Sequence, residues 1–181
     1  MSVAQWKRIA LFIEGEEDRA FAERILKPRL QERYNEVRIQ THARTPDEQL
    51  RSHFRSLKRM GSDLFLLVDY DRGLCITAVR QKYAQRYEPH LGETQVLVAR
   101  PMIEAWYTAG VPHQNPFKAS IPPIVESVDK QAFAGIFGER ARNREERIVL
   151  LQQILAVYDW GLALQRSESL RYCAIKLGIA E

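Results

Sequence analysis

The run Asp63–Asp69, DLFLLVD, is the most apolar short stretch of the chain, and Tyr70-Asp71-Arg72-Gly73 follows it directly. Continuous apolar residues between two aspartates are typical of a central strand that is covered on both faces of a parallel sheet. The change to a polar segment with a glycine marks the end of the strand. We therefore predict a buried strand over residues 63–69, with an Asp-x-Asp pair at its carboxyl end.

Three further strands are expected around this one. Arg8–Ile13, RIALFI, is a second apolar run and ends abruptly at Glu14-Gly15. Glu36–Thr41, EVRIQT, alternates apolar and polar residues, which is typical of a strand near the edge of a sheet. Thr94–Ala99, TQVLVA, is the fourth. The two apolar runs have the composition of buried strands.

Helical patterns separate the four strands. One starts at Glu16 and is expected to be disturbed at Pro28, one runs from Pro46 to Gly61, and one covers residues 76–87. The resulting order βαβαβαβ predicts an α/β fold, with a parallel sheet of about four strands joined by right-handed crossovers. Ligands of such sheets bind where the carboxyl ends of the strands open.

The remainder of the chain is predicted to be a loop and a helical extension. A short helix is expected from Pro101, a loop over 110–125, a helix with Ile148 and Leu151 on its apolar face from Asn143, and a last helix over 167–178. We expect residues 1–110 to form the core and residues 111–181 to pack on it as a cap, in a single compact domain.

Composition limits the function classes. The 181 residues carry 28% charged and 45% hydrophobic side chains and a formal charge of +4, which is typical of a globular protein and permits nucleic-acid binding. No apolar run approaches the roughly 18 residues of a membrane span, so we predict a cytoplasmic protein without a membrane partner. Cys75 and Cys173 have no metal-ligand spacing and are expected to be buried thiols.

Three carboxylates are predicted to meet at the carboxyl edge of the sheet. Glu14 follows the first strand, Asp69 ends the third, and Asp71 lies two residues further on. Carboxylate oxygens are the ligands that Mg²⁺ prefers, together with water and substrate phosphate. We therefore predict a Mg²⁺ or Mn²⁺ site in which the metal neutralises phosphate oxygens.

The same residues also allow interpretations other than a metal site. Asp-x-Asp after a strand also occurs as a plain turn, because aspartate accepts hydrogen bonds from nearby backbone N–H groups. Glu16, Glu17 and Asp18 suit the first turn of a helix better than they suit a metal. A nucleotide-binding site at this edge is less favoured, because no glycine-rich loop follows the first strand.

The segments FIEGEED (12–18) and LLVDYDRG (66–73) together resemble the TOPRIM domain. This domain occurs in topoisomerases, bacterial primases, recombination mediators and the nucleases of the overcoming-lysogenization-defect family. The segment ARPMIEAWYTAG (99–110) further resembles a small stand-alone bacterial TOPRIM family of unknown function. The resemblance covers about residues 8–110, and the remaining residues carry no recognised motif.

By this resemblance, Glu14 is the metal-proximal acid or general acid/base, and Asp69 and Asp71 are metal ligands. Glu104 is a candidate for a further ligand, although it could instead be solvated or paired with Arg100. Arg72 and Arg100 are candidates for binding phosphate through their guanidinium groups, and each could equally form an ion pair.

The sequence carries neither a tyrosine-bearing winged helix nor a zinc-binding or polymerase-like region, so we expect neither a complete topoisomerase nor a primase. A metal-dependent nuclease or phosphotransfer enzyme remains, acting on nucleic acid and on DNA in preference to RNA. The resemblance also implies a bacterial defence or toxin module and an ATPase partner. The alternative is a non-catalytic TOPRIM module that binds nucleic acid or regulates a partner protein.

Overall fold

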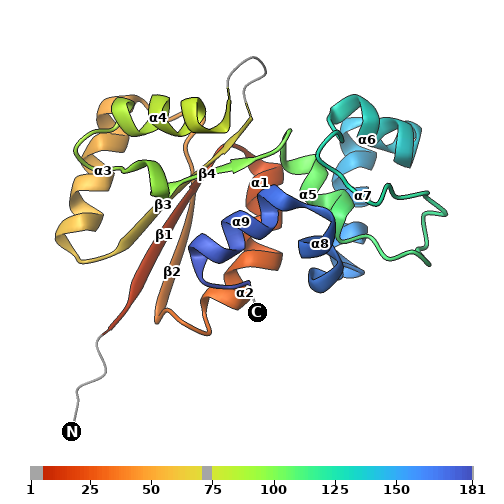
Figure 1. The fold of residues 1–181 in the computed structure, drawn as a ribbon, viewed down its shortest axis with the longest axis horizontal. Helices are drawn as coiled ribbons and strands as arrows, with labels where there is room; N and C mark the ends of the chain where they lie inside the picture. The colour runs from red at the N-terminus through yellow and green to blue at the C-terminus, as the bar shows by residue number, and fades with distance from the viewer. Residues whose placement is uncertain (1–5, 71–74, 181) are drawn as a thin grey trace, which may run out of the picture. The chain divides into compact units, whose positions relative to one another are not determined.

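The computed structural model of the chain describes residues 6–70 and 75–180 and contains the predicted parallel sheet. The strands β1 (Arg8–Ile13), β2 (Glu36–Thr41), β3 (Asp63–Asp69) and β4 (Val96–Ala99) lie in the order β2-β1-β3-β4, all parallel (Figure 1). Leu11 of β1 pairs with Ile39 on one side and with Phe65 on the other. The predicted α/β class is therefore confirmed, with β1 inside the sheet and β2 at its edge.

Helices cover both faces of the strands. In Figure 1, α1 (Glu16–Phe21) and α2 (Lys27–Leu30) lie on one side, and α3 (Asp47–Arg59) and α4 (Ile76–Arg86) on the other. The second face is closed by aromatic side chains, because the Phe54 ring stands 4.8 Å from that of Phe12 and 5.2 Å from that of Tyr87. The first crossover leads from β1 to β2 on one side, and the later ones lead to β3 and β4 on the other side of β1, so the winding reverses between β1 and β3. Such a switch point is where open α/β sheets bind ligands.

The helix that follows β1 is disturbed as predicted, but before Pro28 rather than at it. The turn Ala22–Leu26, labelled η1, is a π-helix between α1 and α2. Proline has no N–H group, and its ring collides with the carbonyl group four residues earlier in a regular α-helix. The wider π turn over that carbonyl relieves this collision.

The chain divides into two compact units, Met1–Val68 with Cys75–Leu97, and Asp69–Leu74 with Val98–Glu181. The boundary falls between Val68 and Asp69 in β3 and between Leu97 and Val98 in β4. The residues just after β4 make contacts with the C-terminal helices. The second unit contains the helices α5 (Ile103–Ala109), α6 (Lys130–Phe137), α7 (Arg144–Ala156), α8 (Trp160–Arg166) and α9 (Glu168–Leu177).

The helical part differs from its prediction in three places. The helix α6 was not predicted, and the helix expected from Asn143 is broken into α7 and α8, because Asp159 caps a new helix through Leu162 N–H. Ile148 is 51% exposed instead of buried, whereas Leu150 and Leu151 are buried. Within residues 6–70 and 75–180 no single helix is long and apolar enough to cross a membrane; α7 and α8 pass that test together, but are bent by 106°.

The cysteines also differ from each other. Cys173 is buried as predicted, but Cys75 is exposed. The Cys75 sulfur accepts a hydrogen bond from Ala78 N–H and so caps the first turn of α4. A helix end at the surface explains its exposure, because the orphan N–H groups of a first turn take either a side-chain acceptor or water.

Gly110 is expected to tolerate no side chain. A Cβ atom there would stand 2.3–2.5 Å from the Tyr158 ring, whose hydroxyl donates a 2.8 Å hydrogen bond to Trp106 O. Gly110→Ala must displace this ring, and we expect it to lower the free energy of unfolding by about 1–3 kcal/mol. Gly135→Ala is the control, because its Cβ meets nothing within 4 Å and alanine favours the helix α6. Equal urea-unfolding midpoints for the two variants would contradict this prediction.

Candidate active site

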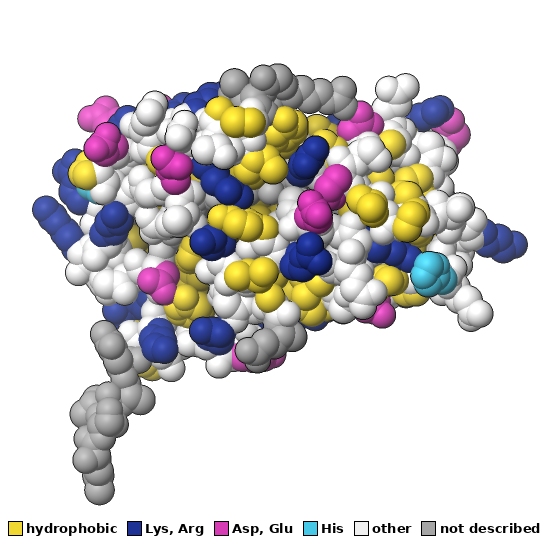
Figure 2. Space-filling view, in the orientation of Figure 1, with side chains coloured by type: hydrophobic (Ala, Val, Ile, Leu, Met, Phe, Trp, Pro, Cys, Tyr) yellow, Lys and Arg dark blue, Asp and Glu magenta, His cyan; other side chains and the backbone are white. Residues whose placement is uncertain are grey.

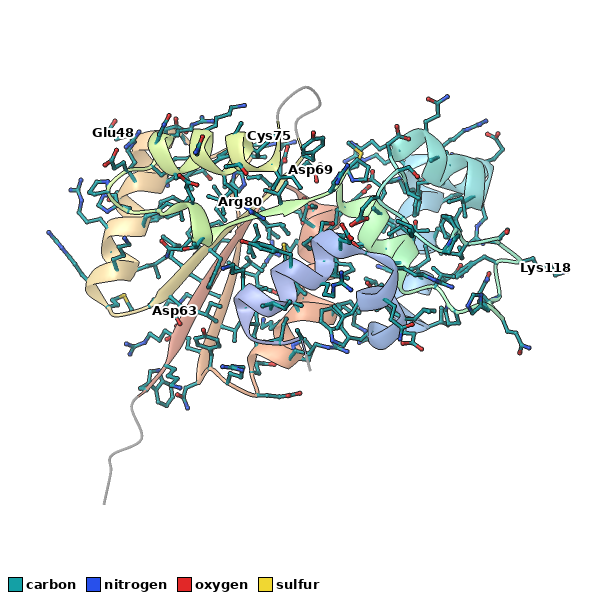
Figure 3. The ribbon with its side chains drawn as sticks, viewed as in Figure 1. Glu48, Asp63, Asp69, Cys75, Arg80 and Lys118 are labelled. Carbon is teal, nitrogen blue, oxygen red and sulfur yellow. The ribbon has the colours of Figure 1, made fainter. Side chains whose placement is uncertain are left out.

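Glu14 and Asp69 occupy the positions that the sequence predicts for them. Glu14 directly follows β1 and is exposed, and Asp69 is the last residue of β3. Because β1 and β3 are adjacent parallel strands, both residues belong to the carboxyl edge of the sheet, at its switch point. Figure 3 labels both ends of β3, Asp63 at the amino end and Asp69 at the carboxyl end.

The acids that follow Glu14 serve the start of α1. Asp18 is 7% exposed, and its Oδ2 accepts a 2.7 Å hydrogen bond from Gly15 N–H. This contact closes the turn between β1 and α1. It confirms the helix-start interpretation for Asp18 and leaves Glu14 as the acid that the end of the strand presents.

His42 lies at the same edge and was not singled out from the sequence. Its backbone N–H donates a 2.8 Å hydrogen bond to Ile13 O, and its Nε2 lies 3.5 Å from Leu67 O of β3. Burial lowers the pKa of His42, and the negative charge of Glu14 opposes this shift in part. The position was available from the sequence, because His42 directly follows β2 as Glu14 directly follows β1.

His42 is expected to make stability depend on pH. Because its pKa is lowered in the folded protein, the unfolded chain takes up a proton first, with a pKa of about 6.5. The contribution of the neutral imidazole is therefore complete above that pH and is lost as the pH falls toward the folded-state pKa. We expect the free energy of unfolding to fall more between pH 7.5 and 5 in the wild type than in His42→Gln. If the free energy of unfolding, measured with urea, falls by the same amount in the two proteins between pH 7.5 and 5, the prediction is wrong.

Within the second unit, Arg100 lies beside the residue that follows Asp69. Tyr70 N–H donates to Ala99 O at 2.9 Å and to Pro101 O at 3.2 Å, which joins the end of β3 to the end of β4. The Arg100 side chain is exposed, and its guanidinium carbon lies 5.8 Å from the centre of the Tyr70 ring. None of the ion pairs among the described residues includes Arg100. The role of Arg100 in phosphate binding stays a prediction.

A buried polar network holds the backbone at Arg100. Ser169 Oγ accepts hydrogen bonds from Arg100 N–H at 3.3 Å and from Trp106 Nε1 at 2.9 Å. The carboxylate of Glu126 accepts in turn from Ser169 N–H at 2.8 Å and from Ser167 Oγ at 3.2 Å. These contacts fix the start of the segment that leads to Glu104.

Glu104 is paired with Arg147 rather than with Arg100. Its side chain is fully buried, and its Oε1 accepts a 2.8 Å hydrogen bond from Arg147 Nη2. Arg147 also donates to Ala141 O and lies over the Phe133 ring, 5.0 Å from its centre. The structure thus shows a contact that links α5 to α7, while the metal role of Glu104 stays a prediction.

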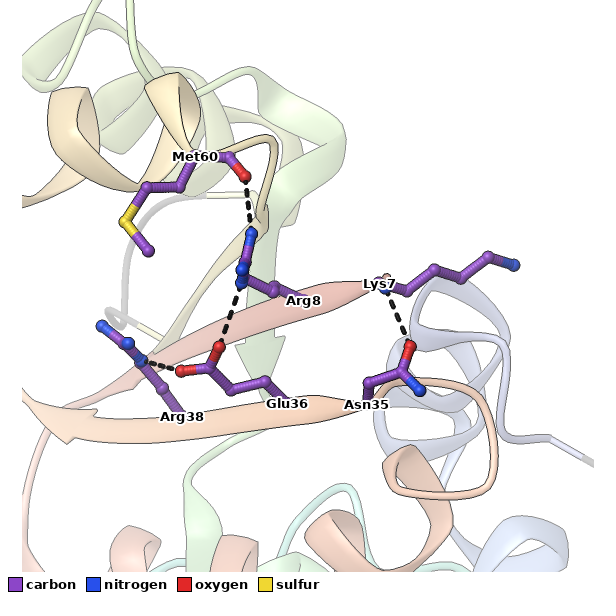
Figure 4. Close-up of polar contacts among 6 residues, drawn as sticks. All are labelled: Lys7, Arg8, Asn35, Glu36, Arg38 and Met60. Atoms are coloured by element: carbon purple, nitrogen blue, oxygen red, sulfur yellow. Dashed lines mark hydrogen bonds and ion pairs between the residues drawn. The ribbon is translucent and has the colours of Figure 1, made fainter. Parts of the chain in front are cut away.

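The opposite edge of the sheet is closed by surface contacts of an ordinary kind (Figure 4). At the amino ends of β1 and β2, Glu36 accepts from Arg8 at 3.0 Å and from Arg38 at 2.6 Å. Arg8 also donates to Met60 O after α3. These partly exposed pairs align the two strands, and each carboxylate of this edge is engaged, Glu36 by two arginines and Asp63 by the Tyr34 hydroxyl.

Two of the predicted site residues, Asp71 and Arg72, lie outside the described residues. Within the described ranges, no group of three or more His, Cys, Asp or Glu side chains is arranged to hold a metal ion. The donor types at the edge nevertheless suit Mg²⁺, because carboxylates are hard oxygen ligands. A magnesium site here would require Asp71 to complete it.

A comparison of the chain with protein-family models, with curated proteins and with solved structures found no match. The TOPRIM resemblance therefore depends on the motifs in residues 12–18 and 66–73. Both motifs end a strand of the sheet, and the two strands are neighbours. The proposed function therefore depends on these residues and their positions.

Proposed function

We propose that this protein is a Mg²⁺-dependent, TOPRIM-like nuclease or phosphotransfer enzyme that acts on nucleic acid. The observation that carries the proposal is the position of Glu14 and Asp69 at the carboxyl ends of two adjacent parallel strands, where the winding of the sheet reverses. Ligands bind at this place in open α/β sheets. The acids there make a metal-bridged phosphate the best-suited ligand, because carboxylates alone repel phosphate.

Glu14, Asp69 and Asp71 would hold the metal ion. When bound, Mg²⁺ supplies charge neutralisation at the phosphate and lowers the pKa of a water molecule. Glu14 would take up or deliver a proton, as its exposed position at the end of β1 allows. Arg100 would bind a phosphate oxygen and stabilise charge that develops there, and Arg72 would do the same.

The setting of this activity is also part of the proposal. We place the protein in the cytoplasm, with DNA favoured over RNA as its substrate. A bacterial defence or toxin module with an ATPase partner is the context that the TOPRIM resemblance implies. The helical unit is then available to contact such a partner.

A non-catalytic module is the second candidate. The observation that favours it is that the described residues alone do not assemble three metal ligands. Such a module would bind nucleic acid or a partner protein through the same fold. Its binding would survive substitution of Asp69, whereas an enzyme would lose its activity.

The test of the proposal is cleavage of labelled single-stranded and duplex DNA and RNA by the purified protein in Mg²⁺ or Mn²⁺. The variant Asp69→Ala/Asp71→Ala is assayed beside the wild type. Metal-dependent cleavage that the variant lacks is the expected result. If the wild type cleaves none of these substrates although calorimetry shows metal binding, an enzyme that needs its partner for activity or the second candidate is favoured.

A further inference from the structure

One face of α3 carries a row of cations. Arg51, Arg55 and Lys58 are four and three residues apart, a spacing that places them on the same side of a helix. Leu50, Phe54 and Leu57, each one position earlier, are buried. The basic row therefore lies next to the buried stripe, and Arg55 and Lys58 are exposed. We name these three cations, with the imidazole of His90 beside them, the α3 basic face.

The charges of this face converge. The pKa of His90 is lowered, by burial first and then by the positive charges of Arg55, Lys58 and Arg51. All three cations are thus close enough to one imidazole to act on it. Figure 2 shows Lys and Arg side chains at the left of the view, where α3 lies in Figure 1, with acidic side chains between them.

Nearby acids do not neutralise the face. Asp47 is held by Arg86 through two 2.7 Å hydrogen bonds. Arg51 donates to the carbonyl oxygens of Glu88 and Arg86, and Lys58 to Pro89 O at 3.2 Å. Among the residues that the structure describes, no carboxylate forms an ion pair with Arg51, Arg55 or Lys58. The carbonyl contacts hold the Arg51 and Lys58 side chains in place without an ion pair, and Arg51 acts on Asp47 only through its charge, as one of the smaller causes that lower the pKa of Asp47.

The shape of the face selects among anionic partners. Lys58 follows Arg51 by seven positions in the helix, so the row spans about 10 Å at a helical rise of about 1.5 Å per residue. Arg51 is pre-organised by its two carbonyl contacts and lies 5.8 Å from the centre of the Tyr87 ring. The row itself carries no exposed apolar side chain that could enter a membrane. A linear, regularly charged chain fits such a row better than a single small anion does.

We propose that the α3 basic face binds the phosphate backbone of nucleic acid, independently of base sequence. The proposal deepens the function proposed above, since it names where the first unit contacts the substrate. Guanidinium groups meet phosphate oxygens through paired hydrogen bonds, and each neutralised phosphate releases counterions. Binding at this face needs no metal ion.

The test is fluorescence anisotropy with a labelled duplex DNA in EDTA, over a series of salt concentrations. The variant Arg55→Gln/Lys58→Gln removes two charges, and Arg51 is kept because its contacts support the chain after α4. We expect affinity to fall about 10-fold or more, and the slope of log K against log salt to decrease in magnitude by about 2. The control is Arg171→Gln/Lys176→Gln on α9, which removes two exposed cations and should leave the slope within about 0.5 of the wild type.

The outcomes separate this proposal from the proposed function. Unchanged affinity and slope in Arg55→Gln/Lys58→Gln overturn the role of the face. So does binding of anionic vesicles or of an acidic peptide in place of DNA by the wild type. DNA binding in EDTA that depends on the face, without cleavage in Mg²⁺, supports this proposal and contradicts the nuclease. Cleavage that is unaffected by the variant contradicts the face alone.

Discussion

Substitution of Asp69 by asparagine or of Glu14 by glutamine is expected to reduce metal-dependent cleavage at least about 100-fold, because loss of groups that merely support a metal ligand already costs about 10- to 100-fold. Both changes keep the size of the side chain and remove only its charge. Glu14 is exposed and Asp69 half-buried at the end of a strand, so the fold should persist. Cleavage rates in Mg²⁺ and calorimetric titration with Mg²⁺ measure the two effects.

Matched controls exist for both positions. Glu16→Gln removes an acid from the first turn of α1, two residues from Glu14. Asp63→Asn removes the aspartate at the other end of β3, whose carboxylate accepts a 2.7 Å hydrogen bond from Tyr34. Both controls should retain cleavage. A Glu14→Gln or Asp69→Asn protein that binds Mg²⁺ and cleaves like the wild type would remove these residues from the site.

The sheet could be predicted from the sequence because its signals are local. The strands over 8–13, 36–41 and 63–69 have the predicted bounds, since apolar runs bounded by polar residues leave little freedom for burial. The fourth strand is two residues shorter, with a 3₁₀ turn at Glu93–Gln95 where its start was expected. The helices α6 to α8 were harder, because Asp129 and Asp159 act as caps only where tertiary packing turns the chain.

The candidate site shows the same division. The positions of Glu14 and Asp69 follow from strand ends and strand order, which the sequence pattern predicts. The partner of Glu104 does not, because Arg147 lies 43 residues away and is brought to it only by the packing of α7. The cations of α3 were not singled out from the sequence, because charges on an amphipathic helix usually form only a solvated face. Their convergence on His90 depends on the chain that follows α4.

The buried pair of Glu104 and Arg147 allows a prediction that does not depend on the proposed activity. Arg147→Met replaces the cation beside the fully buried Glu104 carboxylate with an apolar side chain. Breaking a buried pair in this way costs about 3–5 kcal/mol. We expect the free energy of unfolding to fall by that amount. Glu104→Leu/Arg147→Met should recover much of it, because well-packed apolar side chains can replace a buried pair.

An exposed ion pair in the same unit serves as the control. Arg142 pairs with Glu139 at the surface, where the two side chains are 61% and 82% exposed, so Arg142→Met should cost less than about 1 kcal/mol. Urea unfolding of both variants measures the difference between their losses in the free energy of unfolding. The Arg147 guanidinium also covers the ring of Phe133, so Arg147→Met removes this contact as well. Equal losses in Arg147→Met and Arg142→Met would mean that Glu104 does not depend on Arg147 for its charge.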